Sequence, residues 1–223
     1  LPLLGTFTLP LAGLIAGILT VVSAIAFATS VDHNLENNTI ILTGMVLSLF
    51  ISSIITVMYT FSREFMERIL FWQMGSFSSK TWTQVGILTP VTLLGLFFLV
   101  FYSRELDLMT FGEEQAKSSG VDLKRVKWTL LLITAIMTGS AISFVGIIGF
   151  VDLIAPHIVR KIFGSSHRLA LPMSALLGGT FMVVADLIAR TVIAPSEMPV
   201  GAVTALVGAP FFAYIYFSRR RKV

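Results

Sequence analysis

The sequence has no cysteine, and this absence excludes disulfide bridges, thiolate metal sites and cysteine nucleophiles within the chain. Charged residues are scarce as well. They make up only 13% of the 223 residues, whereas an ordinary soluble domain carries about 25%. A water-soluble surface cannot be built from so few charges. Because 55% of the residues are hydrophobic and they come in long runs, the composition indicates a membrane protein.

The phosphate-binding pattern Gly-x-x-x-x-Gly-Lys-Ser/Thr is also missing from the sequence. We therefore expect no ATP chemistry from this chain, no bound cofactor and no enzymatic activity. The formal net charge is +4, but the basic residues lie at the ends of apolar runs and in the C-terminal tail. Since no groove-reading motif accompanies them, they indicate membrane topology and not nucleic-acid binding.

Several apolar runs are close to 20 residues long, which matches a hydrocarbon core of about 30 Å at about 1.5 Å per helical residue. Between the second and third runs, residues 62–82 mix charged and apolar side chains, a pattern typical of an amphipathic helix at the membrane interface. The predicted spans are residues 9–28, 39–61, 85–102, 171–193 and 200–217.

The apolar stretch 128–160 is too long for one span and too short for two. We predict one full span followed by a short or broken one, with Gly146 and Gly149 at the break and Pro156 inside the second piece. The predicted fold class is therefore all-α, a polytopic membrane helix bundle of about seven crossings.

Basic residues favour the cytoplasm in short loops. If the C-terminal tail is cytoplasmic and seven crossings alternate, then 12 of the 16 Lys and Arg residues lie inside. The linker 29–38 also falls inside, although it has no basic residue and carries Asp32 and Glu36. The four basic residues expected outside are Arg63, Arg68, Lys80 and Arg190.

The polar segment 103–127 contains FGEEQAKSSG at residues 111–120. Glu113 and Glu114 would lie in the first turn of a short helix, where acids are favourable, and Gly120 would cap its C-terminus. Taken by itself, this pattern is also that of an ordinary solvated loop helix.

Further motifs follow along the chain, and in this order they resemble the iron-chelate and cobalamin (FecCD-like) permease family of ABC importers. Ser119 stands where that family usually has leucine, Ile147 replaces a common proline and Asp152 replaces a small residue. The resembling motifs are WQMGSF from Trp72, the FGEEQAKSSG segment, GIIGFVDLIAPHIVRKIFGSSHR from Gly146, DLIAR from Asp186, EMPVG from Glu197 and GAPF from Gly208.

The resemblance implies a transmembrane permease subunit in the cytoplasmic (inner) membrane of a prokaryote, with its C-terminus in the cytoplasm. A complete family member has about ten crossings, so residues 1–223 would be one permease domain that lacks its N-terminal third. The implied partners are the bilayer, a second permease copy, two cytoplasmic ATPase subunits that use the ATP, and an extracytoplasmic binding protein. The implied cargo is an iron chelate (siderophore or haem) or cobalamin.

The resemblance also implies roles for individual residues. Segment 103–127 would be the cytoplasmic coupling segment, and the helix break would border the translocation pathway. The implied sites are an ATPase-coupling interface (Gly112, Glu113, Glu114, Ala116, Lys117, Gly120), a binding-protein docking site (Arg190, Glu197) and the break or pathway (Gly146, Gly149, Pro156, Asp186).

Asp186 and Arg190 are four residues apart, so they share one helix face in the favourable acid-before-base order. A purely structural ion pair is therefore an alternative to docking at Arg190. Two other functions stay open for the whole chain. An ion-coupled secondary transporter would suit the broken helix and an intramembrane Asp, and an intramembrane hydrolase could use Ser140 and His157 as nucleophile and base.

Overall fold

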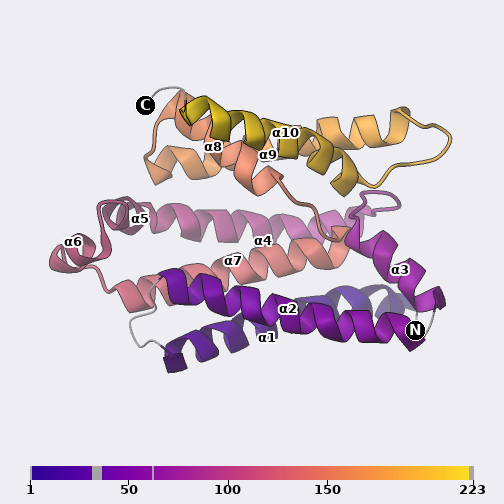
Figure 1. Cartoon of the computed structure of the whole chain (residues 1–223), viewed down its shortest axis with the longest axis horizontal. Helices are drawn as coiled ribbons and strands as arrows, with labels where there is room; N and C mark the ends of the chain where they lie inside the picture. The colour runs from indigo at the N-terminus through magenta and orange to yellow at the C-terminus, as the bar shows by residue number, and fades with distance from the viewer. Residues whose placement is uncertain (1, 32–36, 62, 221–223) are drawn as a thin grey trace. The chain divides into compact units, whose positions relative to one another are not determined.

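The computed structural model describes residues 2–31, 37–61 and 63–220, and these ranges contain helices and connecting turns but no strand (Figure 1). The all-α fold class is confirmed. In chain order the helices are α1 (Pro2–Val31), α2 (Asn37–Phe61), α3 (Arg63–Gln73), α4 (Trp82–Phe101), α5 (Ser103–Met109), α6 (Glu113–Ser118), α7 (Leu123–Val145), α8 (Val151–Phe163), α9 (His167–Thr191) and α10 (Val200–Arg220).

Five of these helices, α1, α2, α4, α7 and α9, are long and apolar enough to cross a membrane. Large apolar side chains on them, such as Leu49, Phe97 and Val183, are more than 60% exposed. Faces of this kind need lipid or other protein against them. The protein is therefore a multi-pass membrane protein.

The predicted count of seven crossings stays a prediction. Helix α8 has 13 residues, which gives a length of about 20 Å, shorter than the hydrocarbon core. In α10 the apolar stretch is Val200–Ala213. The acidic residues of the linker, Asp32 and Glu36, and the tail residues 221–223 lie outside the described ranges.

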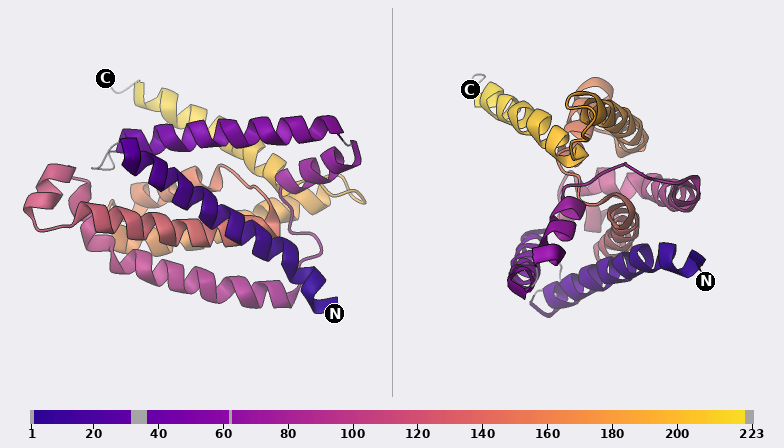
Figure 2. Two further views of the ribbon diagram at one scale, coloured as in Figure 1. Left: turned by 90° about the horizontal axis from the view of Figure 1, so that it is seen from below. Right: turned by 90° about the vertical axis from the view of Figure 1, so that its right-hand side faces the viewer.

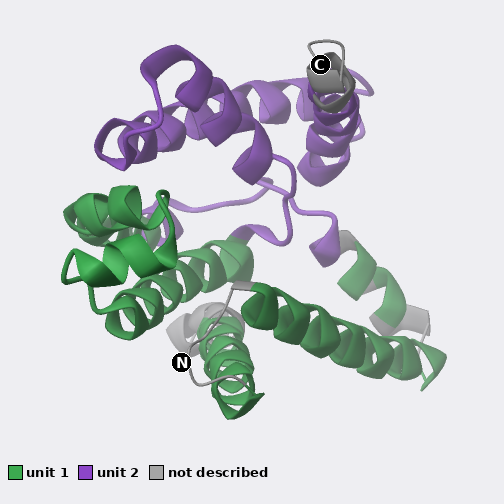
Figure 3. Cartoon of the chain, turned by 60° about the vertical axis from the view of Figure 1, so that its left-hand side comes forward, with its two compact units in different colours: residues 1–70, 86–144 green, residues 71–85, 145–223 purple. Residues whose placement is uncertain are grey.

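Among the described residues of the predicted amphipathic segment 62–82, Arg63–Gln73 form α3 and Trp82 already begins α4. Between these helices the chain turns through Gly75, whose φ of +69° suits a residue without a side chain. Contacts divide the chain into two compact units (Figure 3), one built from residues up to 70 and from 86–144, the other from 71–85 and the residues after 144.

In the first unit, α1 and α2 lie side by side, as Figures 1 and 2 show. Ile25 and Ala28 of α1 are buried there against Ile40 of α2 and Trp128 of α7. Small residues let the helices approach closely, and a Cβ on Gly17 of α1 would lie only 3.5 Å from the Cα of Gly139 in α7.

In the second unit, α8 packs along α9, and α10 contacts both (Figures 1 and 2). The buried core between α9 and α10 is made mostly of small side chains, which allow close helix packing. Its members are Ala185, Ala189, Val200 and Val203, with Phe77, Met182 and Met198 packed against them.

The predicted helix break lies at residues 146–150, between α7 and α8. Gly146 has φ +79° and Phe150 has φ +69°, so the chain leaves the right-handed helical region at both ends of the break. The carbonyl oxygen of Phe150 then accepts a bond from the N–H of Ile154 at 2.9 Å as α8 begins. Pro156 lies inside α8, as predicted.

Candidate functional site

The predicted coupling segment, residues 103–127, is built from α5, α6 and the first turns of α7. Figure 1 shows α5 and α6 at the end of α4 and the beginning of α7. Helix α6 starts after Gly112, which has φ +118°. The acidic pair lies in the first turn of α6 and Lys117 lies in its last turn, so both ends complement the helix dipole.

Gly120 ends α6 as predicted. Its φ is +87°, and its N–H donates to the carbonyl oxygen of Lys117 at 3.0 Å, while the N–H of Val121 donates to that of Ala116 at 3.1 Å. These two bonds form a Schellman motif, in which glycine is the favoured residue because its conformation is left-handed. The turn directs the chain from α6 into α7.

The six predicted interface residues do not all face outward. Ala116 is completely buried, whereas Glu114 and Lys117 are exposed. The carboxylate of Glu113 is directed inward, where both of its oxygens accept bonds from Nζ of Lys127 at 2.9 Å. Ala116 and Glu113 therefore hold α6 in place, and Glu114 and Lys117 are the side chains available to a partner.

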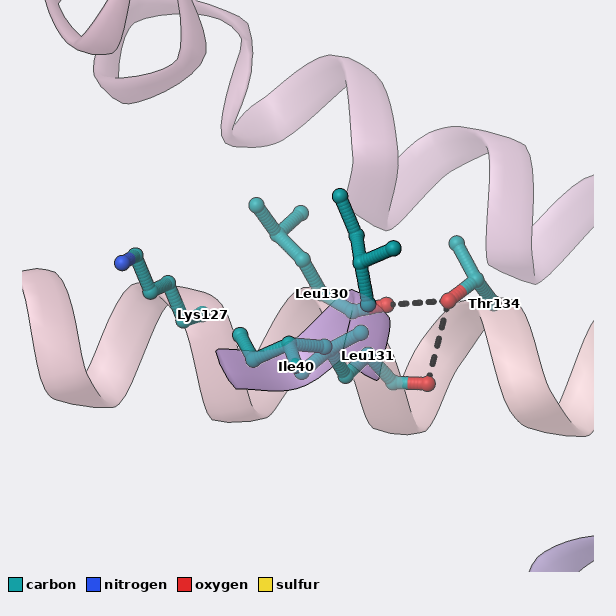
Figure 4. A pocket seen from close by; sticks show the side chains of 6 residues that line it. Ile40, Lys127, Leu130, Leu131 and Thr134 are labelled. Carbon is teal, nitrogen blue, oxygen red and sulfur yellow. Dashed lines mark hydrogen bonds between the residues drawn. The ribbon is translucent and has the colours of Figure 1, made fainter. Parts of the chain in front are cut away.

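Lys127 is only 5% exposed, although it carries a charge. It borders a cavity of about 420 Å³ between α2 and α7, which is lined mainly by aliphatic side chains such as Ile40, Leu130 and Leu131. Figure 4 shows the Lys127 nitrogen directed away from these side chains. The hydroxyl of Thr134 is occupied by the carbonyl oxygens of Leu130 and Leu131. The cavity is thus apolar, and the ammonium of Lys127 is paired with the carboxylate of Glu113.

In the second unit, three glycines bring three of the sequence motifs together. A Cβ on Gly146 would collide with the carbonyl oxygen of Trp72 and lie 3.0 Å from the Cα of Gly75. A Cβ on Gly201 would collide with the carbonyl oxygen of Met74. We call Gly75, Gly146 and Gly201 the glycine junction, since only residues without side chains permit these backbones to meet.

Backbone hydrogen bonds hold the glycine junction. The N–H of Ser76 donates to the carbonyl oxygen of Val145 at 2.9 Å, which ties the turn after α3 to the end of α7. The first N–H groups of α10, those of Val200 and Gly201, donate to the carbonyl oxygens of Gly75 and Met74, each at 3.1 Å. The turn thus caps the start of α10, whose first N–H groups have no partner within the helix.

Two further motif contacts lie in the same unit. The aromatic ring of Phe150 lies against Gly208 of α10, where a Cβ would collide with it. At the other end of α8, the guanidinium of Arg160 contacts Nε2 of His167 at 3.2 Å. The Phe150 contact thus joins two motifs that are far apart in the sequence, whereas the Arg160 contact lies within one motif and links the end of α8 to the start of α9.

The predicted docking residues form an acid and base cluster at the end of α9. Arg190 Nε donates to Asp186 at 2.9 Å, and Arg190 Nη1 lies 3.8 Å from Glu197. Ser78 Oγ also donates to Glu197. The side chain of Arg190 is 43% exposed. The pair with Asp186 therefore exists, and the guanidinium remains accessible to a partner.

The hydrolase hypothesis finds little support in the geometry. The hydroxyl of Ser140 is buried and donates to the carbonyl oxygen of Ile136 one turn earlier at 2.6 Å, the usual bond of a serine inside a helix. His157 is half-buried in α8. Among the described residues, no group of His, Asp and Glu side chains is arranged to hold a metal ion.

Comparison with known proteins identifies the family that these motifs indicate. The FecCD transport family matches residues 1–218. The chain belongs to that family. All of the sites described above lie within the FecCD match, from the turn at Trp72 to Gly208.

Curated relatives agree with this assignment. An uncharacterized ABC transporter permease protein, YvrB of Bacillus subtilis, is 40% identical over 99% of this chain and 63% of its own length. The cobalamin import system permease protein BtuC of Halobacterium salinarum is 39% identical over 87% of this chain and 52% of its own length. The chain therefore spans between half and two thirds of these relatives.

A solved structure has the same fold. It is described as an inward-facing conformation of a metal-chelate type ABC transporter, and it matches with a TM-score of 0.81 and 28% identity. The match covers 94% of this chain and 72% of that one. FecCD membership, the apolar spans and this fold together make the chain a membrane protein of the FecCD transport family.

Proposed function

We propose that the protein is the permease subunit of an ABC importer that moves a metal chelate, such as a ferric siderophore, haem or cobalamin, across the inner membrane. The FecCD match over residues 1–218 carries the proposal. The similarity of this chain to a metal-chelate transporter and to a cobalamin permease supports this class of cargo. Transport, not a reaction catalysed by this chain, is the proposed activity.

The energy for transport comes, in this proposal, from two separate ATPase subunits that contact the coupling segment. Glu114 and Lys117 are exposed on α6. Glu113 and Ala116 of the same helix are directed inward, where Glu113 binds Lys127 and Ala116 is buried. A second permease copy completes the pathway, and an extracytoplasmic binding protein delivers the cargo at Arg190 and Glu197. We propose no cofactor for this chain, since the ATP is bound by the partner subunits.

The proposed orientation places the coupling segment and the C-terminus in the cytoplasm. Helix α9 supports it because His167–Thr191 is 25 residues long and reaches about 37 Å, enough to cross. Arg168 and Arg190 then lie on opposite sides. Arg160 and Lys161 in the last turn of α8 lie on the same side as Arg168, so this side carries the greater number of basic residues, which favours the cytoplasm.

We predict that Ser118→Cys resists an impermeant thiol reagent added to whole cells, because Ser118 lies in the coupling segment inside the cell. Ser196→Cys is the matched variant, since Ser196 is exposed in the turn between α9 and α10 and should label from outside. Residues 1–223 contain no cysteine, so no other thiol within them reacts with the reagent. Strong labelling at Ser118 with protection at Ser196 would reverse the topology.

The energy source separates the proposal from an ion-coupled transporter. We expect uptake of labelled ferric siderophore or cyanocobalamin, tested singly in cells with the complete transporter, to collapse when ATP is depleted and to survive an uncoupler. An ion-coupled transporter would show the opposite pattern. The geometry favours the first result at one of the candidate acids, because the carboxylate of Asp186 is engaged by Arg190 at 2.9 Å.

A further inference from the structure

The ion pair between Glu113 and Lys127 links the start of α6 to α7, in addition to the Schellman turn that joins the two helices along the chain. Glu113 belongs to the first turn of α6, and Lys127 lies in the second turn of α7, 14 residues later. Both carboxylate oxygens are 2.9 Å from Nζ. The ammonium of Lys127 therefore binds both oxygens of the Glu113 carboxylate.

Burial makes this contact different from an ordinary surface ion pair. The side chain of Lys127 is 5% exposed and that of Glu113 is 34% exposed. Charges in such a place need a partner, and removal of one partner leaves the other charge uncompensated and costly.

A second ion pair in the same segment provides a natural comparison. Asp122 and Arg125 are 3.0 Å apart, but their side chains are 55% and 88% exposed. Exposed pairs of this kind contribute little. The pair of Lys127 and Glu113 is thus partly buried and connects α6 to α7, whereas the pair of Asp122 and Arg125 is exposed where α7 begins.

We propose that Lys127 is a positioning residue for the coupling segment, which binds Glu113 so that α6 keeps its orientation on α7 and presents Glu114 and Lys117 to the ATPase subunit. The inference rests on the proposed function and deepens it. Helix α6 has only six residues, too few to be stable without tertiary contacts. The ion pair, the buried Ala116 and the Schellman turn at Gly120 are the contacts that hold it.

Through this clamp, α6 moves together with α7, which runs from the coupling segment to the helix break at residue 146. A force applied by the ATPase subunit on α6 reaches α7 through the buried ion pair as well as through the chain. Glu113 thus serves the interface indirectly, and its carboxylate does not contact the ATPase subunit.

The test uses the complete permease with its own ATPase subunit in nanodiscs and measures the dissociation constant of that subunit together with the melting temperature. We expect Lys127→Met and Glu113→Gln each to weaken binding by at least about tenfold, as loss of a buried partner predicts. The exchange Glu113→Lys with Lys127→Glu should restore binding to within about threefold. Arg125→Met, which breaks only the exposed pair, is the control for stability and should leave the melting temperature unchanged.

Three results would overturn the inference. If Lys127→Met binds as the unchanged permease does, Lys127 positions nothing. If the exchanged pair stays as weak as Glu113→Gln, the carboxylate of Glu113 contacts the ATPase subunit directly. If only the melting temperature falls and binding by the folded protein is kept, the pair is purely structural. Failure of the unchanged permease to bind any ATPase subunit would instead refute the proposed function.

Discussion

Replacement of Gly146 by valine is expected to abolish most of the folded permease in the membrane. The residue has φ +79°, a conformation that costs an ordinary residue about 1–2 kcal/mol. The new side chain would also press on the carbonyl oxygen of Trp72 and on the Cα of Gly75, and overpacking costs about 1–3 kcal/mol more. A total of about 2–5 kcal/mol is a large part of a typical stability of about 5–15 kcal/mol.

The measurement is membrane yield and melting temperature of the complete subunit in detergent. Gly149→Ala is the matched control, because Gly149 lies in the same break with nothing within 4 Å of an added Cβ and without a positive φ. We expect that variant to behave as the unchanged protein. Equal yield and melting temperature for Gly146→Val would show that the backbones at the glycine junction separate without cost.

The local features of this fold were predictable because they depend on residues close together in the sequence. Apolar runs of about 20 residues predicted the membrane spans. A run too long for one span and too short for two, with Gly146 inside it, predicted the helix break. Gly120 after a short polar helix gave the C-terminal cap, since a left-handed turn there favours glycine. Each of these patterns is complete within about 30 residues, which is why sequence reasoning found them.

The contacts between motifs could not be predicted in the same way. Gly75, Gly146 and Gly201 were each noticed in a separate motif, but no periodic pattern says that three turns meet. Lys127 appeared only as one of several basic residues that favour the cytoplasm, and Ser78 was not noticed at all. Their partners, Glu113 and Glu197, are known only once the chain is folded.

Asp152 illustrates a departure that the structure partly explains. The sequence has a carboxyl near the helix break, where the resemblance led us to expect a small residue. In the structure Asp152 is exposed in the first turn of α8. An acid at that position complements the positive end of the helix dipole, so the substitution is favourable for α8 itself.

Reversal of charge at Arg190 is expected to weaken docking of the extracytoplasmic binding protein by more than about tenfold, because like charges then face each other across the interface. The geometry strengthens this expectation. Arg190 already lies between Asp186 at 2.9 Å and Glu197 at 3.8 Å. Arg190→Glu would therefore gather three acids where the unchanged protein presents an oriented cation. Affinity is measured by titrating the binding protein onto the complete permease and its ATPase in nanodiscs.

Two further variants separate docking from a structural ion pair. Asp186→Asn keeps the Arg190 cation but removes its carboxylate partner. The affinity for the binding protein should then stay within about fivefold of that of the unchanged permease, because a partly exposed ion pair contributes little. The exchange Asp186→Arg with Arg190→Glu restores a pair on α9 but turns an acid toward Glu197. We expect that variant to regain part of the melting temperature and none of the docking affinity. If the melting temperature recovers and affinity never changed in either Arg190 variant, the guanidinium serves only to hold the end of α9, and the binding protein docks elsewhere.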